Sequence, residues 1–358
     1  MADTAQATRW RGRGLTVAIL AVLLLAAIAA ASAYYVLIQT PLQARLNDAN
    51  NMVMRLSGLQ NPAPHRLDPR YGEANAELLA STPTDPAKQI DPPKLMFSYI
   101  PADDSADYKT AFAELMDHIS KATGKPVEYF EAATTDEQLR ALRDGKLQIT
   151  TLNTGNVPLG VCEAGFIPLA GWGNASGTSK YQMEIVVSTK TDMNTVNDLH
   201  GHELTLTDPG SNSGYKAPLV LLKSDFGLLP GRDFGIRYSG GHPQSVRGLA
   251  DGTYEAIAVA NDVLHRLTSE GVIKQEQFRS IYKSEDFPTA AIGYAYNLKP
   301  ALATEIRGAI LDFEWAGTGL QKEFAPANQD RFVPVDYKND WALVRRIDDN
   351  IGFAYEIK

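Results

Sequence analysis

The sequence is poor in cysteine, with Cys162 as the single thiol among 358 residues. One cysteine excludes an internal disulfide, a CxxC redox pair and a thiolate-rich zinc site. Disulfides therefore cannot indicate the compartment of the protein, which has to be inferred from other features.

Basic residues are also in short supply, since 34 Lys and Arg stand against 42 Asp and Glu and give a formal net charge of -8. This balance argues against nucleic acid as a partner, because phosphate backbones are bound through many lysines and arginines. An anionic ligand would have to be held by local hydrogen-bond donors, not by the field of the whole protein. With 44% hydrophobic residues, the chain can still bury a core large enough for more than one lobe.

Charge is missing altogether between residues 14 and 39. Such a run is long enough to cross a hydrocarbon core of roughly 30 Å as a helix. The basic residues that precede it are Arg9, Arg11 and Arg13. The positive-inside rule then predicts a cytoplasmic segment at 1–14, a membrane anchor at 15–38 and an extracytoplasmic remainder. We expect a single-pass protein of the inner membrane whose folded part faces the periplasm.

A cleavable signal peptide is the alternative for the same segment. Ala31, Ser32 and Ala33 have the small-x-small form that a signal peptidase accepts. The apolar run is longer than the usual signal-peptide core, which favours the anchor. No cysteine stands directly after the run, which excludes a lipoprotein anchor. Both interpretations place the rest of the chain on the same side of the membrane.

Residues 39–93 carry the signals of a connection between the membrane segment and the folded part. The stretch LQARLNDANNMVMRLSGL has apolar residues at roughly helical spacing and predicts a short juxtamembrane helix. The motifs NPAPH, STPTDP and DPP that follow are typical of turns. We expect a Pro-rich linker that acts as a spacer.

From residue 94 onward, apolar β-rich runs alternate with helical patterns. LMFSYI, VEYFEA and LQITTL are interpreted as strands, and the helix after the first of them ends at Gly124, Lys125 and Pro126. This alternation predicts sheets covered by helices on both faces. The number of alternations favours an α/β fold of two doubly wound lobes joined by a hinge. The expected lobes are lobe 1, formed by 94–184 and 287–358, and lobe 2, formed by 185–286.

The most informative motif is TLTDPGSNSGYKAPLVLL, which leads from a strand through a loop of small residues into an apolar helix. Free backbone N–H groups at a helix start, together with the hydroxyls of Ser211 and Ser213, can hold a tetrahedral oxyanion without a lysine. Gly210 and Gly214 would allow a close approach of the ligand to the backbone. The alternative is an ordinary serine N-cap with no ligand.

A second loop of similar design follows in YSGGHPQSVRGLADG, where His242 stands at the turn and Ser245 opens a helix. A histidine there can donate a proton to an oxyanion and can change its charge near neutral pH. The alternative is a histidine that only caps its own loop. His200 and His202 lie in a turn without a third ligand, so we expect no metal site.

The sequence resembles the phosphonate-binding component of ABC importers, a group of type II periplasmic binding proteins, from about Leu95 to Val335. The resemblance is carried by SYIPADD, DEQLRALRDGKLQITTLNTGN, IVVSTKTDMNTVNDLHGHELTLTDPGSNSGYKAP, SGGHPQSVRGLADGTYEAIAVANDVL and IYKSEDFPTAAIGYA. It implies two lobes that close around the ligand without chemical conversion. The positions that it implies for the phosphonate oxygens are Ser211, Asn212, Ser213 and His242. Asp262 matches an acidic position that holds the amino group of an aminoalkyl phosphonate, although it could instead be a helix cap.

This chain also departs from that family. Thr154, Gly155 and Asn156 stand where the family often offers a tyrosine before the Gly-Asn pair, and Thr134 or Thr135 replaces a second tyrosine. A further acidic position is replaced by Thr289-Ala290-Ala291. Tyr99 and Tyr181 complete the expected wall of the site, although Tyr181 could serve packing alone. These changes leave phosphite, phosphate or a different phosphonate as open as an aminoalkyl phosphonate.

The expected function is that of a solute-binding protein, which passes a small phosphorus oxyanion to an ABC permease and needs no cofactor. The alternative is a membrane-tethered sensory or interaction protein that uses the same ligand-binding fold without transport. An enzyme is disfavoured, because the sequence shows no nucleophile–base pair, no metal set and no P-loop.

Overall fold

The computed structural model describes residues 3–40, 53–55, 57–59, 66–73, 77–99, 108–352 and 355–357. It divides the chain into one unit at Met1–Val53 and a second at Met54–Lys358. The predicted juxtamembrane helix falls largely outside the described residues, and so does most of the SYIPADD loop.

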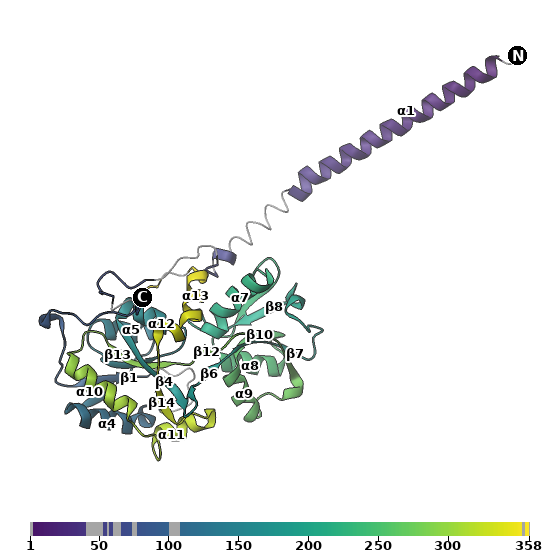
Figure 1. Cartoon of the computed structure of the whole chain (residues 1–358). Coiled ribbons are helices and arrows are strands. Elements are labelled where there is room, and N and C mark those ends of the chain that lie inside the picture. The colour runs from purple at the N-terminus through teal and green to yellow at the C-terminus, as the bar shows by residue number, and fades with distance from the viewer. Residues whose placement is uncertain are drawn as a thin grey trace. The chain divides into compact units, whose positions relative to one another are not determined.

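The N-terminal unit contains α1 (Asp3–Tyr34), which continues into a short π-helical segment (Tyr35–Gln39) (Figure 1). Residues Ile19–Gln39 form a helix long and apolar enough to cross a membrane. Because a signal sequence has the same length and composition, this helix is a candidate for either the predicted anchor or the predicted signal.

The first sheet of the larger unit has the strand order β14-β4-β13-β3-β1-β2, with β5 paired to β4. Strands β1, β2 and β3 pair in parallel, whereas β13, β4 and β14 are antiparallel to their neighbours. The strands are β1 (Leu95–Ser98), β2 (Val127–Tyr129), β3 (Ile149–Leu152), β4 (Phe166–Asn174), β5 (Gly177–Thr178), β13 (Ala291–Ala295) and β14 (Arg331–Pro334). The helices of this lobe are α3 (Tyr108–Ala111), α4 (Ala113–Thr123), α5 (Thr135–Arg143), α6 (Val157–Ala164), α10 (Pro300–Leu311), α11 (Gly319–Phe324) and α12 (Tyr337–Asp340).

The second sheet has the order β11-β7-β10-β8-β9, in which β10, β8 and β9 are parallel. Its strands are β7 (Met183–Ser188), β8 (Glu203–Leu206), β9 (Gly235–Tyr238), β10 (Ala256–Ala260) and β11 (Phe278–Lys283). Its helical segments are η4 (Asn212–Lys216, a π-helix), α7 (Ala217–Phe226), α8 (His242–Asp251) and α9 (Asn261–Ser269). Two sheets with their own helices confirm the predicted α/β fold of two lobes (Figure 1).

The two lobes are joined by two crossing strands. Strand β6 (Lys180–Tyr181) leads from lobe 1 into lobe 2, and β12 (Phe287–Pro288) leads back. They pair antiparallel to each other, with Tyr181 opposite Phe287. A narrow two-stranded connection of this kind is typical of a hinge between lobes.

The chain makes a third crossing with its C-terminal helix, α13 (Ala342–Ile351), which packs against α7 and η4 of lobe 2. At its start, the Nε1 of Trp341 donates a hydrogen bond to the carbonyl oxygen of Thr154 in lobe 1, at 3.1 Å. Helix α13 therefore contacts both lobes, although the sequence assigned residues 287–358 to lobe 1.

The linker differs from the predicted spacer, because its described part packs against the folded lobes. Leu59 and Tyr71 are buried, and the Tyr71 ring contacts Tyr296 edge to face. Lys223 of α7 donates to the carbonyl oxygen of Leu59 at 2.9 Å. Residue 90 pairs with residue 298 as an isolated bridge. Tertiary packing of a few apolar side chains orders a segment that has no local periodicity.

Candidate functional site

A cavity of about 410 Å³ is lined by loops of both lobes and by residues at the crossing strands. Lobe 1 contributes the loop after β3, and lobe 2 contributes the loops after β8, β9 and β10. The sequence-predicted residues that line it are Tyr99, Thr154, Gly155, Asn156, Tyr181, Ser211, Asn212, Ser213, His242 and Asp262. No lysine or arginine is among the described residues that line the cavity, so its polar groups are mostly uncharged donors.

The loop after β8 places two serine hydroxyls at the start of a helix. Ser211 is the N-cap of η4, and its Oγ accepts a hydrogen bond from the N–H of Gly214 at 3.0 Å. The first N–H groups of a helix, here those of Asn212 and Ser213, have no intrahelical acceptor. The predicted serine N-cap is thus present, and it leaves donors at the cavity wall that suit an anion.

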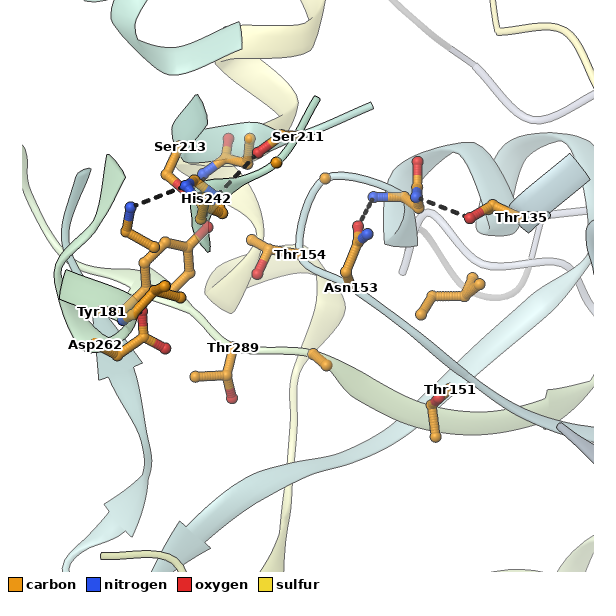
Figure 2. Close-up of a pocket in the computed structure, with 18 of the residues that line it drawn as sticks. Thr135, Thr151, Asn153, Thr154, Tyr181, Ser211, Ser213, His242, Asp262 and Thr289 are labelled. Atoms are coloured by element: carbon orange, nitrogen blue, oxygen red, sulfur yellow. Dashed lines mark hydrogen bonds between the residues drawn. The ribbon is translucent and has the colours of Figure 1, made fainter. Parts of the chain in front are cut away.

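The imidazole of His242 contacts the hydroxyls of both serines. Its Nε2 lies 3.3 Å from the Oγ of Ser211 and 3.3 Å from the Oγ of Ser213. Its Nδ1 accepts a hydrogen bond from the N–H of Ala260 at 3.4 Å, so the proton of the neutral ring lies on Nε2. Figure 2 shows the three side chains gathered at one end of the cavity.

The charge of His242 follows from its surroundings. Burial without a carboxylate partner lowers the pKa of the imidazole to about 4. The ring is therefore neutral at pH 7 and donates through Nε2. Because the Oγ of Ser211 already accepts from Gly214, its hydroxyl hydrogen is free to point at a ligand.

Two predicted site residues do not line the cavity. Gly214 faces Thr207, whose Oγ1 would lie 2.0 Å from a Cβ at that position, so the glycine allows close packing within lobe 2. Ser245 is fully buried, and its hydroxyl shares a 2.7 Å hydrogen bond with Ser239. Ser245 therefore stabilises the loop that carries His242 and does not point into the cavity.

Tyr181 and Asn212 form a second polar pair beside the serines. The Nδ2 of Asn212 donates to the Tyr181 hydroxyl at 3.1 Å. Burial raises the pKa of Tyr181, although hydrogen-bond contacts with Thr154, Asn212 and Ser213 oppose the shift. Tyr181 stays a neutral phenol, which can act as donor or acceptor at this wall.

Asp262 lies in the first turn of α9, two residues after the N-cap Ala260. Its Oδ1 accepts a hydrogen bond from the N–H of Val263 at 2.8 Å. Burial raises the pKa of its carboxyl, and the Val263 N–H partly opposes that shift. In Figure 2 the carboxylate lies beside Tyr181 and faces Thr289. Asp262 is thus one of two acidic residues that line the cavity, the other being Asp208 in the serine loop.

The lobe 1 wall is built on the loop after β3. The Oγ1 of Thr154 donates to the carbonyl oxygen of Pro288 at 2.8 Å, which ties this loop to the returning crossing strand. Asn156 donates to Thr135 through Nδ2 at 3.4 Å. Thr154 and Thr135 therefore serve as hydrogen-bonding groups of the wall, and Thr289 lines it as well.

Sequence reasoning missed several residues of the cavity wall. They are Gln138, Thr151, Asn153, Trp172, Asp208, Phe324 and Gln329. Trp172, Phe324 and Gln329 come from segments without a motif, such as β4 and the end of α11. Gln138, Thr151 and Asn153 lie in the stretch DEQLRALRDGKLQITTLNTGN, which carried the family resemblance, and Asp208 opens the DPGSNSG loop that was singled out.

The described residues contain no group of three or more His, Cys, Asp and Glu that could hold a metal ion. The histidines that were considered as ligands each face a single carboxylate at the surface. His200 lies 3.6 Å from Asp233, and His202 lies 3.2 Å from Glu255.

A protein-family model matches most of the two-lobed part of the chain. The model of the periplasmic substrate-binding proteins of phosphonate ABC transporters matches residues 97–341. The phosphate-import protein PhnD of Mycolicibacterium smegmatis is 25% identical to this chain over 206 residues, which are 54% of this chain. The match spans 64% of that relative, somewhat less than two thirds of its length.

Solved structures show the same fold. A binding protein component of an ABC phosphonate transporter from Pseudomonas aeruginosa has a TM-score of 0.59 at 19% identity, over 72% of this chain and 86% of that one. The protein PhnD1 of Prochlorococcus marinus, solved in complex with methylphosphonate, has a TM-score of 0.58 at 15% identity, over 72% and 97% of the two chains. These likenesses confirm the predicted periplasmic binding protein fold.

Proposed function

Because the chain belongs to the family of periplasmic substrate-binding proteins of phosphonate ABC transporters, we propose that it captures a phosphonate or related phosphorus oxyanion in the cavity between its lobes. The family consists of solute-binding proteins, so the expected activity is binding and release without chemical conversion. Closure of the two lobes around the ligand would provide the form that a membrane permease recognises.

The observation that carries the proposal is the convergence of Ser211, Ser213 and His242. Two hydroxyls and one imidazole N–H meet at the start of η4, with both serine oxygens 3.3 Å from the same nitrogen. A small tetrahedral anion needs several donors directed at a common point, and a helix start adds backbone N–H groups and a favourable dipole. A hydrogen bond from a neutral donor to a charge is strengthened where water is excluded, and the side chain of Ser213 is buried.

The choice among phosphorus oxyanions depends on the groups beside this cluster. Asp262 could hold the amino group of an aminoalkyl phosphonate, as the family resemblance implies. The family resemblance implies a second carboxylate for the same amino group, but Thr289 stands at that position in the cavity wall. The relative in Mycolicibacterium smegmatis is a phosphate-import protein, and the Prochlorococcus marinus structure holds methylphosphonate. We therefore include phosphate and phosphonates without an amine among the ligands to be tested.

The proposed place of action is the extracytoplasmic face of the inner membrane. The apolar helix at Ile19–Gln39 would either tether the binding lobes there as a single-pass anchor or be removed as a signal. In both cases the lobes would face the periplasm and could deliver the ligand to an ABC permease.

The proposal is tested by calorimetry of the full chain with phosphate, phosphite, methylphosphonate, aminoethylphosphonate and sulfate. At least one phosphorus oxyanion is expected to bind with a 1:1 ratio, and sulfate serves as the control anion. Absence of binding for all the phosphorus compounds would overturn the proposal. Binding combined with a response of a membrane partner other than a permease would instead favour the sensory alternative.

A further inference from the structure

The lobe 1 part of the cavity differs in character from the lobe 2 loops that carry His242 and the two serines. Its wall includes three aromatic rings, and the ring centroids lie 6.4 Å apart for Tyr99 and Trp172 and 5.8 Å apart for Trp172 and Phe324. Figure 2 shows Thr151 of lobe 1 on the far side of the cavity from His242 and the serines. An oxyanion held by the serines therefore leaves the lobe 1 part to another portion of the ligand.

The cavity is larger than a bare oxyanion requires. Its volume of about 410 Å³ falls within the range of roughly 300–1,000 Å³ that is typical of pockets for drug-sized organic ligands. A phosphate ion or methylphosphonate would fill only a part of this volume. The lobe 1 part therefore has room for an organic substituent on the phosphorus atom.

A buried glutamine of α5 belongs to this part of the wall. Gln138 is 1% exposed and lines the cavity. Its Nε2 donates to the Oγ1 of Thr150 at 2.6 Å and to the carbonyl oxygen of Thr151 at 3.3 Å. The Oγ1 of Thr150 gives its own hydrogen to the carbonyl oxygen of Ser98 at 3.1 Å, so it can only accept from Gln138. These acceptors fix the orientation of the amide, with Nε2 directed toward the sheet.

The amide oxygen of Gln138 points the other way. Among the described residues none donates a hydrogen bond to this Oε1, and the atom is not enclosed by the protein. Gln148, a second buried glutamine of lobe 1, shows the contrast. Its Oε1 accepts from the N–H of Met96 at 2.9 Å, and its Nε2 donates to the carbonyl oxygen of Gly145 at 2.7 Å. A buried acceptor without a donor is costly, whereas a donor on a ligand would satisfy it.

The charges of the cavity wall indicate which donor fits. The described residues of lobe 1 that line the cavity are uncharged, and the two acidic residues, Asp208 and Asp262, belong to lobe 2. Figure 2 shows Asp262 and Thr135, at the start of α5, on opposite sides of the cavity. A carboxylate, a second phosphate or an ammonium group beside Gln138 would be buried without an opposite charge, which is costly. A neutral hydroxyl avoids this cost and can donate to Oε1.

We propose that the cavity takes a phosphonate whose substituent ends in a hydroxyl group, and that Gln138 is the residue that selects it. This inference rests on the proposed function, since His242 and the serines must hold the phosphonate. The carbon atoms of the substituent pack against Trp172 and Phe324, and the hydroxyl donates to the Oε1 of Gln138. An alkyl substituent of the same length leaves that oxygen unpaired, so the site discriminates between the two ligands.

The test is calorimetry of the full chain with pairs of phosphonates that differ only in the terminal group. Hydroxymethyl-, 2-hydroxyethyl- and 3-hydroxypropylphosphonate are each compared with the alkyl phosphonate that carries a methyl group in place of the hydroxyl. At one of these lengths the parent should bind the hydroxyl compound about tenfold more tightly. Gln138→Met should reduce this preference to about twofold or less, because it removes the acceptor and keeps a side chain of similar length.

Gln148→Met is the matched control, because both amide groups of Gln148 bond within lobe 1 and the residue does not line the cavity. This variant should keep the preference of the parent. The preference is a ratio of two affinities, so a general loss of stability in lobe 1 does not change it.

Two results would overturn the inference while the proposed function stands. One is a parent that binds phosphonates and prefers none of the hydroxyl compounds, a comparison that stays decisive if Gln138→Met does not fold. The other is a preference that persists in Gln138→Met. Absence of binding for every phosphonate would instead overturn the proposed function, and this inference with it.

Discussion

The Nε2 of His242 lies 3.3 Å from the Oγ of Ser213, although the two residues belong to different loops of lobe 2. The imidazole is neutral and carries its proton on Nε2, because Nδ1 accepts from the backbone N–H of Ala260. The serine hydroxyl and the imidazole N–H thus lie close enough together to donate to the same oxyanion.

Removal of the Ser213 hydroxyl should weaken oxyanion binding. Ser213→Ala is expected to cost roughly 1–3 kcal/mol, because one charge-assisted hydrogen bond is lost in a buried site. Calorimetry with the tightest ligand of the panel gives the change directly. Ser269→Ala is the matched control, since the Ser269 hydroxyl bonds to the carbonyl oxygen of His265 on the exposed side of α9 and does not line the cavity. Equal affinities of Ser213→Ala and the parent would remove this loop from the site.

The neutral state of His242 predicts a pH-dependent stability of the ligand-free protein. An unfolded histidine has a pKa near 6.5, whereas that of His242 is lowered to about 4 by burial. Between these values the unfolded state binds a proton that the folded state does not, so stability falls as the pH decreases from about 6.5 to 4. The full loss is at most about 3 kcal/mol.

Chemical denaturation of the ligand-free protein at several pH values measures this effect. The difference in unfolding free energy between the parent and His242→Gln should diminish as the pH is lowered through this window. The comparison is needed because burial raises the pKa of Asp262, which has the opposite dependence. A constant difference from pH 7 to pH 4 would show that the imidazole is not held neutral.

Asp262 provides a prediction about specificity. If its carboxylate holds an amine, Asp262→Asn should reduce the affinity for aminoethylphosphonate by about tenfold, as expected for one charge-assisted contact. The affinity for methylphosphonate should stay within twofold, because that ligand has no amine. A parallel loss for both ligands would assign Asp262 to the structure of the α9 start, where it accepts from Val263.

The sequence predicted the lobe 2 side of the site better than the lobe 1 side, for a physical reason. Ser211, Ser213 and His242 lie in short loops between a strand and a helix, where small residues and a helix start are recognisable from consecutive residues. Trp172 and Phe324 reach the cavity from separate segments of lobe 1, so their position depends on how the first sheet folds. No local pattern records that arrangement.

The same limit explains why one predicted site residue does not line the cavity and why one buried residue was not singled out from the sequence. Gly214 lies in the right loop, but its missing side chain makes room for Thr207 and not for a ligand. Lys216 was passed over, although it is buried between Gly155 and Asp348. A lysine is usually exposed, and only the partner at residue 348, far along the chain, explains why this one is not.

The packing of the linker leads to a prediction about stability. The Leu59 side chain is 1% exposed, and its carbonyl oxygen accepts from Lys223 in α7. Leu59→Ala should lower the free energy of unfolding by about 2–5 kcal/mol, as for other buried leucines. Chemical denaturation of the full chain, followed by tryptophan fluorescence, measures the change. Leu78→Ala in the same linker is the control, since that side chain is 37% exposed and should cost less than about 1 kcal/mol. If both substitutions have equally small effects, the segment acts only as a spacer, because a leucine of the core must contribute to the free energy of unfolding.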